Sequence, residues 1–394
     1  MNTIFLNELG IICSMGDDKD QVAKNLFSAS MPETLTLSDE YSIGRPCFIG
    51  SVNMELPDLS HLEKKWQGRN NQLIAAAAEQ IKPAVDALID RYGAHRVAVV
   101  LGTSTSGVGE SEQAHAHKQQ QSEWPDKFHY MQQETGTPAL FLSFLLGISG
   151  PSHVISTACS SSAKAMASGA RLLNAGLADA VIVGGADSLC AFTLAGFGSL
   201  ESLSVDRCNP FSANRKGINI GEGAALFVMS REAGPVQFMG WGESSDAHHM
   251  SAPEPSGAGA GSALSQTLQR ANLQANQIDY INLHGTATLQ NDAMEARIVH
   301  EIFGESVPAS STKAMTGHTL GAAGAIEAGL CWLSLVQNPE NILPVNWYDG
   351  EMDPSIPSIQ LVRPGQKSAK PMQYILSQSF AFGGSNAAIC LGRA

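Results

Sequence analysis

Apolar residues gather in short continuous runs rather than in alternating patterns. RVAVVLGTS (96–104) and DAVIVGGAD (179–187) are typical of strands buried on both faces, and HVISTA (153–158) predicts a shorter strand. SSSAKAMASGARLLNAG (160–176) predicts a helix that ends at Gly176. Strands that alternate with helices predict an α/β protein whose central sheets are covered by helices.

Two pairs of segments repeat one another in the same order along the chain. ISTACSSSAKAMASGARLL (155–173) resembles SSTKAMTGHTLGAAGAIEA (310–328), and each predicts a strand end followed by a helix rich in Ala and Gly. GINIGEGAALFVMSR (217–231) resembles SFAFGGSNAAICLGR (379–393), and each predicts a hairpin with glycines at its turn. The repeats indicate a duplicated architecture.

The two copies meet near Gly234-Pro235, which divides the chain into residues 1–234 and residues 235–394. The length of 394 residues exceeds what one compact core usually holds. Because no linker of disordered composition separates the copies, we expect them to share one continuous body.

Composition and charge narrow the function classes. Hydrophobic residues make up 43% of the chain and charged residues 15%, which suits a well-buried enzyme. The net charge of −13 at pH 7 disfavours a nucleic-acid binder, and an acidic partner would need a local basic patch. The longest apolar run (138–148) is too short to span a bilayer, and the N-terminus predicts a strand rather than a signal peptide. We therefore expect no membrane insertion.

The seven cysteines lie far apart, their number is odd, and no CxxC pair occurs. This pattern favours reduced thiols in the cytoplasm over a disulfide framework or a zinc site, so we expect no metal. The cysteines are Cys13, Cys47, Cys159, Cys190, Cys208, Cys331 and Cys390.

Cys159 follows a predicted strand and opens a predicted helix. Backbone N–H groups at a helix N-terminus favour an anion, here a thiolate. A small cysteine buried in the core fits the same pattern equally well. Cys159 is therefore a candidate nucleophile that needs support from other residues.

His284 ends the strand-like run DYINLH, and the carboxyl end of a buried strand faces the usual ligand edge of an α/β sheet. Taken alone, a satisfied core histidine is the better interpretation. Thr286 and Thr288 fit either hydrogen bonds to an extended polar ligand or the cap of a turn.

Lys313 and His318 flank a turn whose apolar and small neighbours do not suit a solvated lysine. Glu327, on the helix that follows, fits either a counter-ion for Lys313 or a solvent-facing residue. The glycines of SFAFGGSNAA (379–388) indicate a mobile turn, a close approach of the backbone or an ordinary hairpin.

Together these segments form an ordered series that covers nearly the whole chain. The chain resembles the β-ketoacyl-acyl-carrier-protein synthases, in the elongating Cys-His-His branch of the thiolase superfamily. The resemblance implies a thiolase-like duplicated αβαβα fold with two central mixed sheets, with the cysteine in the first half and the histidines in the second. The matching motifs are LGIICSMG, GRNNQLIAAAAEQI, STACSSSAKAMASG, VIVGGAD, NPFSANRKGINIGEGAA, SSDAHHMSAPEPSG, HGTATLQNDAMEA, STKAMTGHTLGAAGAIEA and FAFGGSN.

The resemblance also implies the reaction. An acyl group held on Cys159 would undergo decarboxylative Claisen condensation with malonyl-acyl carrier protein and give 3-oxoacyl-carrier protein, in fatty acid, aryl-polyene or polyketide synthesis. His284 and His318 would be the catalytic imidazoles, supported by Lys313 and Glu327. No cofactor is implied, because the pantetheine arm arrives on the carrier.

Further roles are implied around the nucleophile. The backbone N–H groups of Cys159 and Phe382 would form the oxyanion hole, and the Phe382 side chain would gate access to the thiol. The remaining residues would contact the substrate. They are Thr286 and Thr288 for the phosphopantetheine arm, and Thr105 and Phe197 for the acyl pocket.

Three motifs depart from the family pattern. Ala381 stands where the gating turn usually has Gly, and Glu201 where the docking patch often has Arg. The family's R-P-F-D is Asn209-Pro210-Phe211-Ser212 here. These departures bear on gating and on carrier specificity more than on the chemistry.

An acidic carrier would need a basic surface on this acidic protein. Lys64, Lys65 and Arg69 form the best candidate, and a solvated helix start is the other interpretation. The resemblance implies a dimer that pairs through SHVIST (152–157), either a homodimer or a heterodimer with a homologous chain-length factor.

Two other activities fit the same superfamily less well. A coenzyme A thiolase would use a second, C-terminal cysteine, but Cys390 lies in the strand-like AAICLG rather than in a CxG loop. A non-catalytic partner of a ketosynthase would lack the nucleophile, whereas Cys159 occurs here with both histidines.

Overall fold

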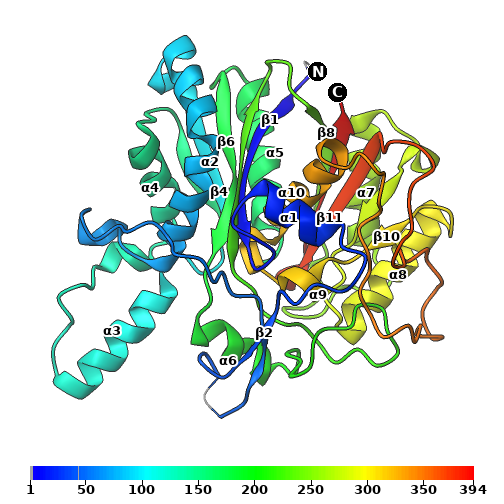
Figure 1. Cartoon of the computed structure of the whole chain (residues 1–394), viewed down its shortest axis with the longest axis horizontal. Helices are drawn as coiled ribbons and strands as arrows, with labels where there is room; N and C mark the ends of the chain where they lie inside the picture. The colour runs from blue at the N-terminus through cyan, green and yellow to red at the C-terminus, as the bar shows by residue number, and fades with distance from the viewer. Residues whose placement is uncertain (1–2, 43) are drawn as a thin grey trace.

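The structure is a computed structural model, and it describes residues 3–42 and 44–394. Within this part of the chain, ten strands form one mixed sheet in the order β10-β9-β11-β12-β8-β1-β7-β6-β4-β5 (Figure 1). Its strands are β1 (Phe5–Cys13), β4 (Val97–Gly102), β5 (Ser152–Ile155), β6 (Ala180–Asp187), β7 (Gly223–Ser230), β8 (Val236–Ser245), β9 (Tyr280–Asn282), β10 (Ala309–Ser310), β11 (Tyr374–Ala381) and β12 (Ser385–Arg393). A separate pair consists of β2 (Thr36–Ser38) and β3 (Cys47–Ile49).

The two halves of the sheet have the same internal order. When the strands of each half are numbered along the chain, both halves have the same spatial order: third, second, fourth, fifth, first. The first half reads β5-β4-β6-β7-β1 and the second β10-β9-β11-β12-β8. The halves join where β1 meets β8 through the pairs Phe5–Gln237 and Leu6–Val236. The predicted α/β duplication is present, and the two predicted sheets are the halves of one continuous sheet.

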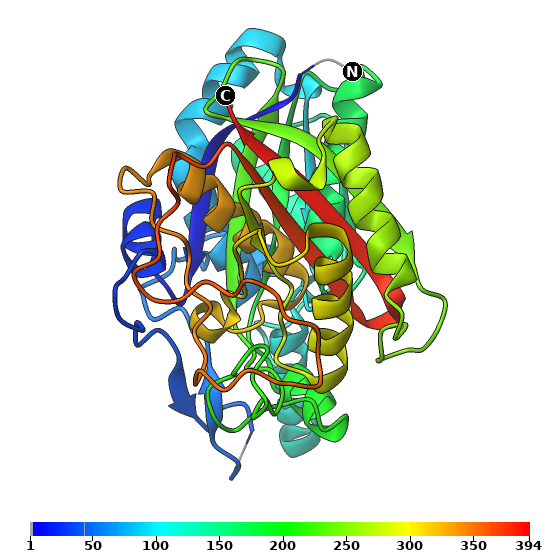
Figure 2. The same cartoon turned by 90° about the vertical axis from the view of Figure 1, so that its right-hand side faces the viewer.

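Helices cover both outer faces and fill the space between the halves. α5 (Ser161–Asn174) and α10 (Ala323–Val336) pack against each other in this central layer (Figure 1). α7 (Ala258–Ala271) and α8 (Leu289–Phe303) lie on the outer side of the second half (Figure 2). The remaining helices are α1 (Lys19–Leu26), α2 (Arg69–Tyr92), α3 (Val108–Gln121), α4 (Thr137–Leu146), α6 (Ala191–Ser199) and α9 (Lys313–Thr316), with α2 and α4 on the outer side of the first half.

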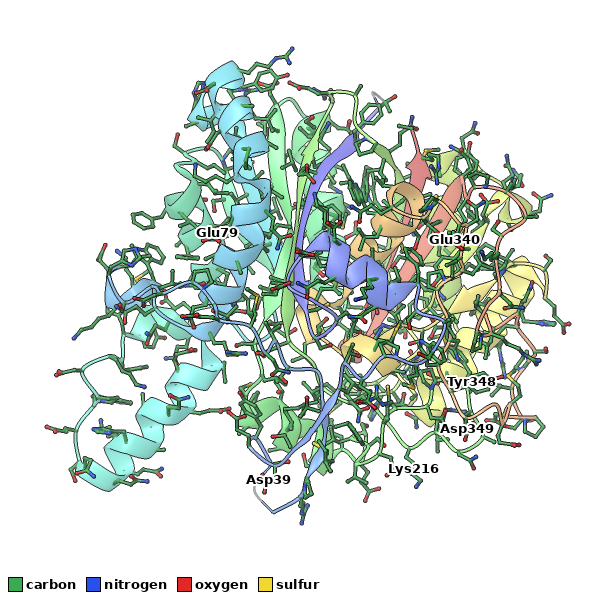
Figure 3. The ribbon with its side chains drawn as sticks, viewed as in Figure 1. Asp39, Glu79, Lys216, Glu340, Tyr348 and Asp349 are labelled. Carbon is green, nitrogen blue, oxygen red and sulfur yellow. The ribbon has the colours of Figure 1, made fainter. Side chains whose placement is uncertain are left out.

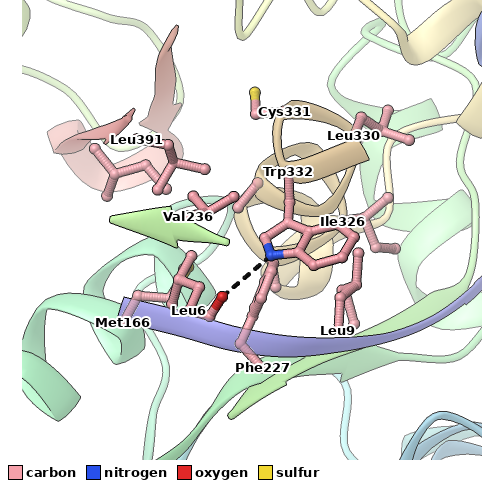
Figure 4. Close-up of a cluster of buried hydrophobic side chains, with 14 of the residues drawn as sticks. Leu6, Leu9, Met166, Phe227, Val236, Ile326, Leu330, Cys331, Trp332 and Leu391 are labelled. Carbon is pink, nitrogen blue, oxygen red and sulfur yellow. Dashed lines mark hydrogen bonds between the residues drawn. The ribbon is translucent and has the colours of Figure 1, made fainter. Parts of the chain in front are cut away.

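Small residues explain how two helices fit between the halves. A Cβ atom added at Gly324 of α10 would lie 2.9 Å from Cβ of Ala163 on α5, so larger side chains would push the helices apart. Elsewhere in this layer large side chains fill the space: Trp332 packs among Leu9 and Phe227, and its indole N–H donates to the Leu6 carbonyl at 3.2 Å (Figure 4). The central layer therefore fixes the N-terminus of α5 against the second half of the chain.

The segments predicted as β4, β5, β6 and α5 have the expected structure. The hairpin predicted at 379–393 is confirmed, since β11 and β12 are joined by the turn Phe382–Gly384. The hairpin predicted at 217–231 is wrong. β7 is a single strand there, because β1 and β6 already occupy both of its edges.

The outside of the fold carries charged side chains such as Glu79, Lys216 and Glu340 (Figure 3). Among the described residues, no helix combines the length and the apolar character needed to cross a membrane.

Candidate active site

Cys159 lies just before α5, where the chain turns sharply from strand to helix. Ala158 takes a left-handed conformation with φ of 51°, and α5 begins two residues after the cysteine. Cys159 is 4% exposed. Burial raises the pKa of the Cys159 thiol to about 11, while the Lys313 ammonium and hydrogen bonds from the backbone N–H groups of Phe382 and of Cys159 itself oppose the rise.

His318 lies within hydrogen-bonding distance of the nucleophile. Its Nε2 lies 2.9 Å from the Cys159 sulfur, and its Nδ1 accepts a hydrogen bond from the backbone N–H of Leu320 at 3.1 Å. An imidazole nitrogen that accepts carries no proton, so the proton of the neutral ring is on Nε2 and faces the sulfur. Burial and the nearby Lys313 lower the pKa of His318 well below its usual value, which keeps the ring neutral.

His284 follows β9 and meets His318 edge to face, with ring centroids 5.4 Å apart. The Lys313 ammonium lies 3.5 Å from Nδ1 of His284, which directs the ring proton to Nε2 here too. Burial, Lys313 and His318 lower the pKa of His284 well below its usual value. The site therefore holds two neutral imidazoles that can each donate a hydrogen bond from Nε2.

Lys313 and Glu327 form a salt bridge with both side chains 2% exposed. Burial raises the pKa of Glu327, and the Lys313 ammonium opposes that rise. Lys313 also donates to the His284 carbonyl oxygen. The lysine thus contacts His284 directly and affects His318 through electrostatic repulsion.

Two buried carboxylates beside His284 are residues that the sequence reasoning did not single out. Glu295 accepts from the backbone N–H groups of His284 and Gly285 at 2.6 and 2.7 Å, and Asp292 accepts from that of Ala287 at 3.1 Å. Burial raises the pKa of Glu295 to about 8 and that of Asp292 to about 6. Their spacing of three along α8, directly after the histidine loop, was the available signal.

A cavity of about 50 Å³ opens in front of the cysteine, and both imidazoles line it. The Phe382 ring packs against Phe197 with centroids 5.4 Å apart, and both line the cavity. Thr286 and Thr288 line it as well, and their hydroxyl oxygens are 2.9 Å apart. The geometry therefore brings the predicted gate, pantetheine contacts and one acyl-pocket residue to the same space.

Thr105 does not line this cavity. Its hydroxyl donates to the buried Asp187 at 2.7 Å, and Asp187 also accepts from the hydroxyl of Thr103 and from the backbone N–H of Ser104. Thr105 therefore anchors the turn after β4 in this structure, and its role in an acyl pocket stays a prediction.

One residue of the basic candidate for carrier docking is already paired. Arg69 is committed elsewhere, because its guanidinium makes two hydrogen bonds to the fully buried Glu222 and one to the Val52 carbonyl. Lys65 lies over the Trp66 ring, 4.8 Å from the ring centre. Arg69 therefore has a structural role in this structure, and its role in carrier docking stays a prediction, as do those of Lys64 and Lys65.

The cysteine and both histidines lie close enough to hold a metal ion, since one ligand atom of each falls within 4.8 Å of the others. A metal would need a free lone pair on each imidazole. The backbone N–H of Leu320 and the Lys313 ammonium both act at Nδ1 and place a proton on the Nε2 atoms that face the cysteine. This arrangement does not fit a metal and does fit donation to an oxygen atom.

Comparison with known proteins gives matches along most of the chain. Residues 72–234 match the β-ketoacyl synthase N-terminal domain, and residues 237–341 match the C-terminal domain of the same synthases. A 3-oxoacyl-[acyl-carrier-protein] synthase 2 of Rhizobium meliloti is 38% identical over 62% of this chain and 61% of its own length. The synthase of the same name from Staphylococcus aureus is 29% identical over 98% of this chain and 97% of its own length.

A solved structure agrees over the whole chain. The ketosynthase ApeO of Xenorhabdus doucetiae, determined in complex with its chain length factor ApeC, is 44% identical and superimposes with a TM-score of 0.94. The match covers 100% of this chain and 98% of that one. A β-ketoacyl synthase from Burkholderia phymatum is 25% identical with a TM-score of 0.89.

Proposed function

Because this chain belongs to the β-ketoacyl synthase family, we propose that it is an acyltransferase that condenses an acyl group with malonyl-acyl carrier protein. One observation carries the proposal. The Cys159 sulfur lies 2.9 Å from Nε2 of His318, the second imidazole, His284, lines the same cavity, and the backbone N–H groups of Cys159 and Phe382 favour a negative charge at this place. This set supplies a nucleophile, an oxyanion hole and two donors for an enolate.

The first half-reaction transfers the acyl group to the enzyme. The Cys159 sulfur attacks the thioester carbonyl, a new C–S bond forms, and the bond to the carrier sulfur breaks. The proton of the cysteine leaves with the carrier as its thiol. The N–H groups of Cys159 and Phe382 stabilise the oxyanion, and one such donor is typically worth about 3–4 kcal/mol.

The second half-reaction forms the carbon–carbon bond. Malonyl-carrier loses carbon dioxide, and the electron pair of the broken bond becomes an enolate on the thioester. His284 and His318 stabilise its oxygen with their Nε2–H groups, so no strong base is required. The enolate carbon attacks the acyl-Cys159 carbonyl, the C–S bond breaks, and one proton restores the thiol while 3-oxoacyl-carrier protein is released.

Acylation tests this proposal directly. The purified protein is incubated with acyl-carrier protein and digested, and the peptide that contains Cys159 is weighed. The expected result is the mass of one acyl group on that peptide. Acylation of another of the cysteines, with Cys159→Ala still forming product, would refute the proposal.

We also propose a partner of the same family. The ketosynthase ApeO was determined with a chain length factor, and at 44% identity it supports a heterodimer over a homodimer. β5 is the free edge strand of the first half, and the neighbouring α4 exposes the apolar Leu140 and Phe144 one turn apart. Light scattering of the chain, alone and co-expressed with a homologous subunit, would decide between the two dimers.

The carrier is proposed to dock near Lys64 and Lys65, because an acidic carrier needs a local basic patch on a protein that is acidic as a whole.

Residues 1–234 are proposed as the half that supplies the nucleophile and residues 235–394 as the half that supplies the histidines, which the repeated strand order supports. A cytoplasmic location is proposed from the seven buried free thiols. Whether the product enters a fatty acid, aryl polyene or polyketide would follow from the acyl groups that load Cys159.

A further inference from the structure

A lysine outside the catalytic set ties the gating turn to the helix of the nucleophile. Lys164 lies on α5, five residues after Cys159, and its Nζ donates to the Ser385 hydroxyl oxygen at 2.6 Å. Ser385 is the first residue after the Phe382–Gly384 turn. The same hydroxyl oxygen accepts from the side chain of Ser160, which precedes α5, at 3.0 Å.

The charge of Lys164 is poorly explained by its surroundings. Burial lowers the pKa of Lys164, and the Arg171 guanidinium on the same helix lowers it further. Among the described residues no carboxylate pairs with Lys164, and the carboxylate of Glu243 is taken by Arg171. A half-buried cation without a carboxylate partner is costly, so the short hydrogen bond from Lys164 to one hydroxyl indicates a functional contact.

The turn itself has little internal rigidity. Gly383 and Gly384 have φ angles of 80° and 73°, a conformation that glycine leaves and enters at low cost. On its outer side the turn is held by backbone bonds from Gly383 N–H to the Met250 carbonyl and from Asp246 N–H to the Gly384 carbonyl, both 2.8 Å. On its inner side the Ser385 hydroxyl is the link to α5.

The position of the turn matters because it carries half of the oxyanion hole. One donor, the N–H of Cys159, belongs to the segment that leads into α5, and the other, the N–H of Phe382, belongs to the turn. We propose that Lys164 is a positioning residue that, through Ser385, holds the Phe382 N–H in register with Cys159 for acyl transfer. The inference rests on the proposed acyltransferase function and deepens it.

Two rate constants separate this role from a merely structural one. Acyl transfer from acyl-carrier protein to Cys159 needs both oxyanion donors, whereas alkylation of Cys159 by iodoacetamide needs the thiolate and access to the sulfur but forms no oxyanion. In Lys164→Met we expect acyl transfer to fall about tenfold, because displacing an oxyanion donor removes much of the stabilisation that deleting the donor would remove. Alkylation should fall clearly less than acyl transfer, because it loses only the effect of the Phe382 N–H on the thiolate, and Lys164→Gln, which keeps a donor, should lose less acyl transfer.

The controls use the same helix and the same hydroxyl. Arg171→Met removes another cation of α5 and should leave acyl transfer within about twofold of wild type. Lys164→Met combined with Ser385→Ala should be no slower than Ser385→Ala alone, since both act through one contact.

Each other result contradicts the inference. Wild-type acyl transfer in Lys164→Met, equal losses of acyl transfer and alkylation, or losses that multiply in the double variant would each overturn it. If Lys164→Met does not fold, the same comparisons are made with Lys164→Gln. A wild-type protein that is never acylated at Cys159 would instead refute the proposed function, so the two failures are distinguishable.

Discussion

Replacing Glu327 by Gln should lower the free energy of unfolding of the protein and slow malonyl decarboxylation. The Lys313 side chain is 2% exposed, and its ammonium meets Glu327, the His284 carbonyl and His284 Nδ1. Breaking a buried ion pair costs about 3–5 kcal/mol, because one charge stays buried and unpaired. Burial raises the pKa of Glu327, so the carboxylate is itself costly to bury, and we expect the lower end, about 3 kcal/mol at pH 7.

Urea denaturation at one protein concentration measures this change, and Glu340→Gln is the matched control. Glu340 pairs with Lys367 on the surface, with side chains 67% and 51% exposed, so the control should lose far less stability than Glu327→Gln. The double variant Lys313→Met with Glu327→Leu should lose clearly less than the sum of the two single variants. A Glu327→Gln variant within 1 kcal/mol of wild type, or strictly additive single losses, would refute the reasoning.

Four further predictions concern the catalytic residues and the proposed docking surface. His284→Ala and His318→Ala should each slow decarboxylation of malonyl-carrier about a hundredfold while acyl transfer to Cys159 persists, and near wild-type condensation in both would contradict the two-imidazole account. Because the thiol pKa is about 11, alkylation of Cys159 by iodoacetamide should accelerate steadily from pH 6 to 9, and a plateau below pH 8 would count against it. Arg69→Met should lower stability by about 3 kcal/mol, the low end for a buried pair, because it leaves the buried Glu222 unpaired while Arg69 itself is partly exposed, and a raised KM for the carrier in the folded variant would support a docking role for Arg69. Lys64→Glu with Lys65→Glu should raise that KM severalfold, most visibly at low salt.

The sequence predicted the fold well where the chain repeats itself. The match between 155–173 and 310–328 anticipated two strand–helix units, and α5 and α10 pack together in the centre of the molecule. The repeat failed at 217–231, because similar glycine patterns cannot show that β7 is paired on both edges while β12 returns beside β11. Whether a segment forms a hairpin depends on which strands lie beside it, and the local sequence pattern does not contain that information.

The candidate site was predicted less evenly. Cys159, His284, His318, Lys313 and Glu327 lie together, and the resemblance had named them all. Their protonation states were beyond sequence reasoning, since these follow from Leu320 N–H and Lys313 Nζ at the two Nδ1 atoms. The ion pair of Arg69 with Glu222 was not predicted, because a basic residue near the surface gives no sign that a buried carboxylate from a distant segment will pair with it.

The central claim is that one cysteine and two imidazoles carry out a decarboxylative condensation. Acyl-loaded wild-type protein is mixed with malonyl-carrier that carries a labelled free carboxyl group, and carbon dioxide and 3-oxoacyl-carrier protein are counted together. The account predicts one carbon dioxide released for each 3-oxoacyl product and each acyl group lost from Cys159, and no product from Cys159→Ala. Product formation by Cys159→Ala, or a 3-oxoacyl product formed without release of labelled carbon dioxide, would contradict it.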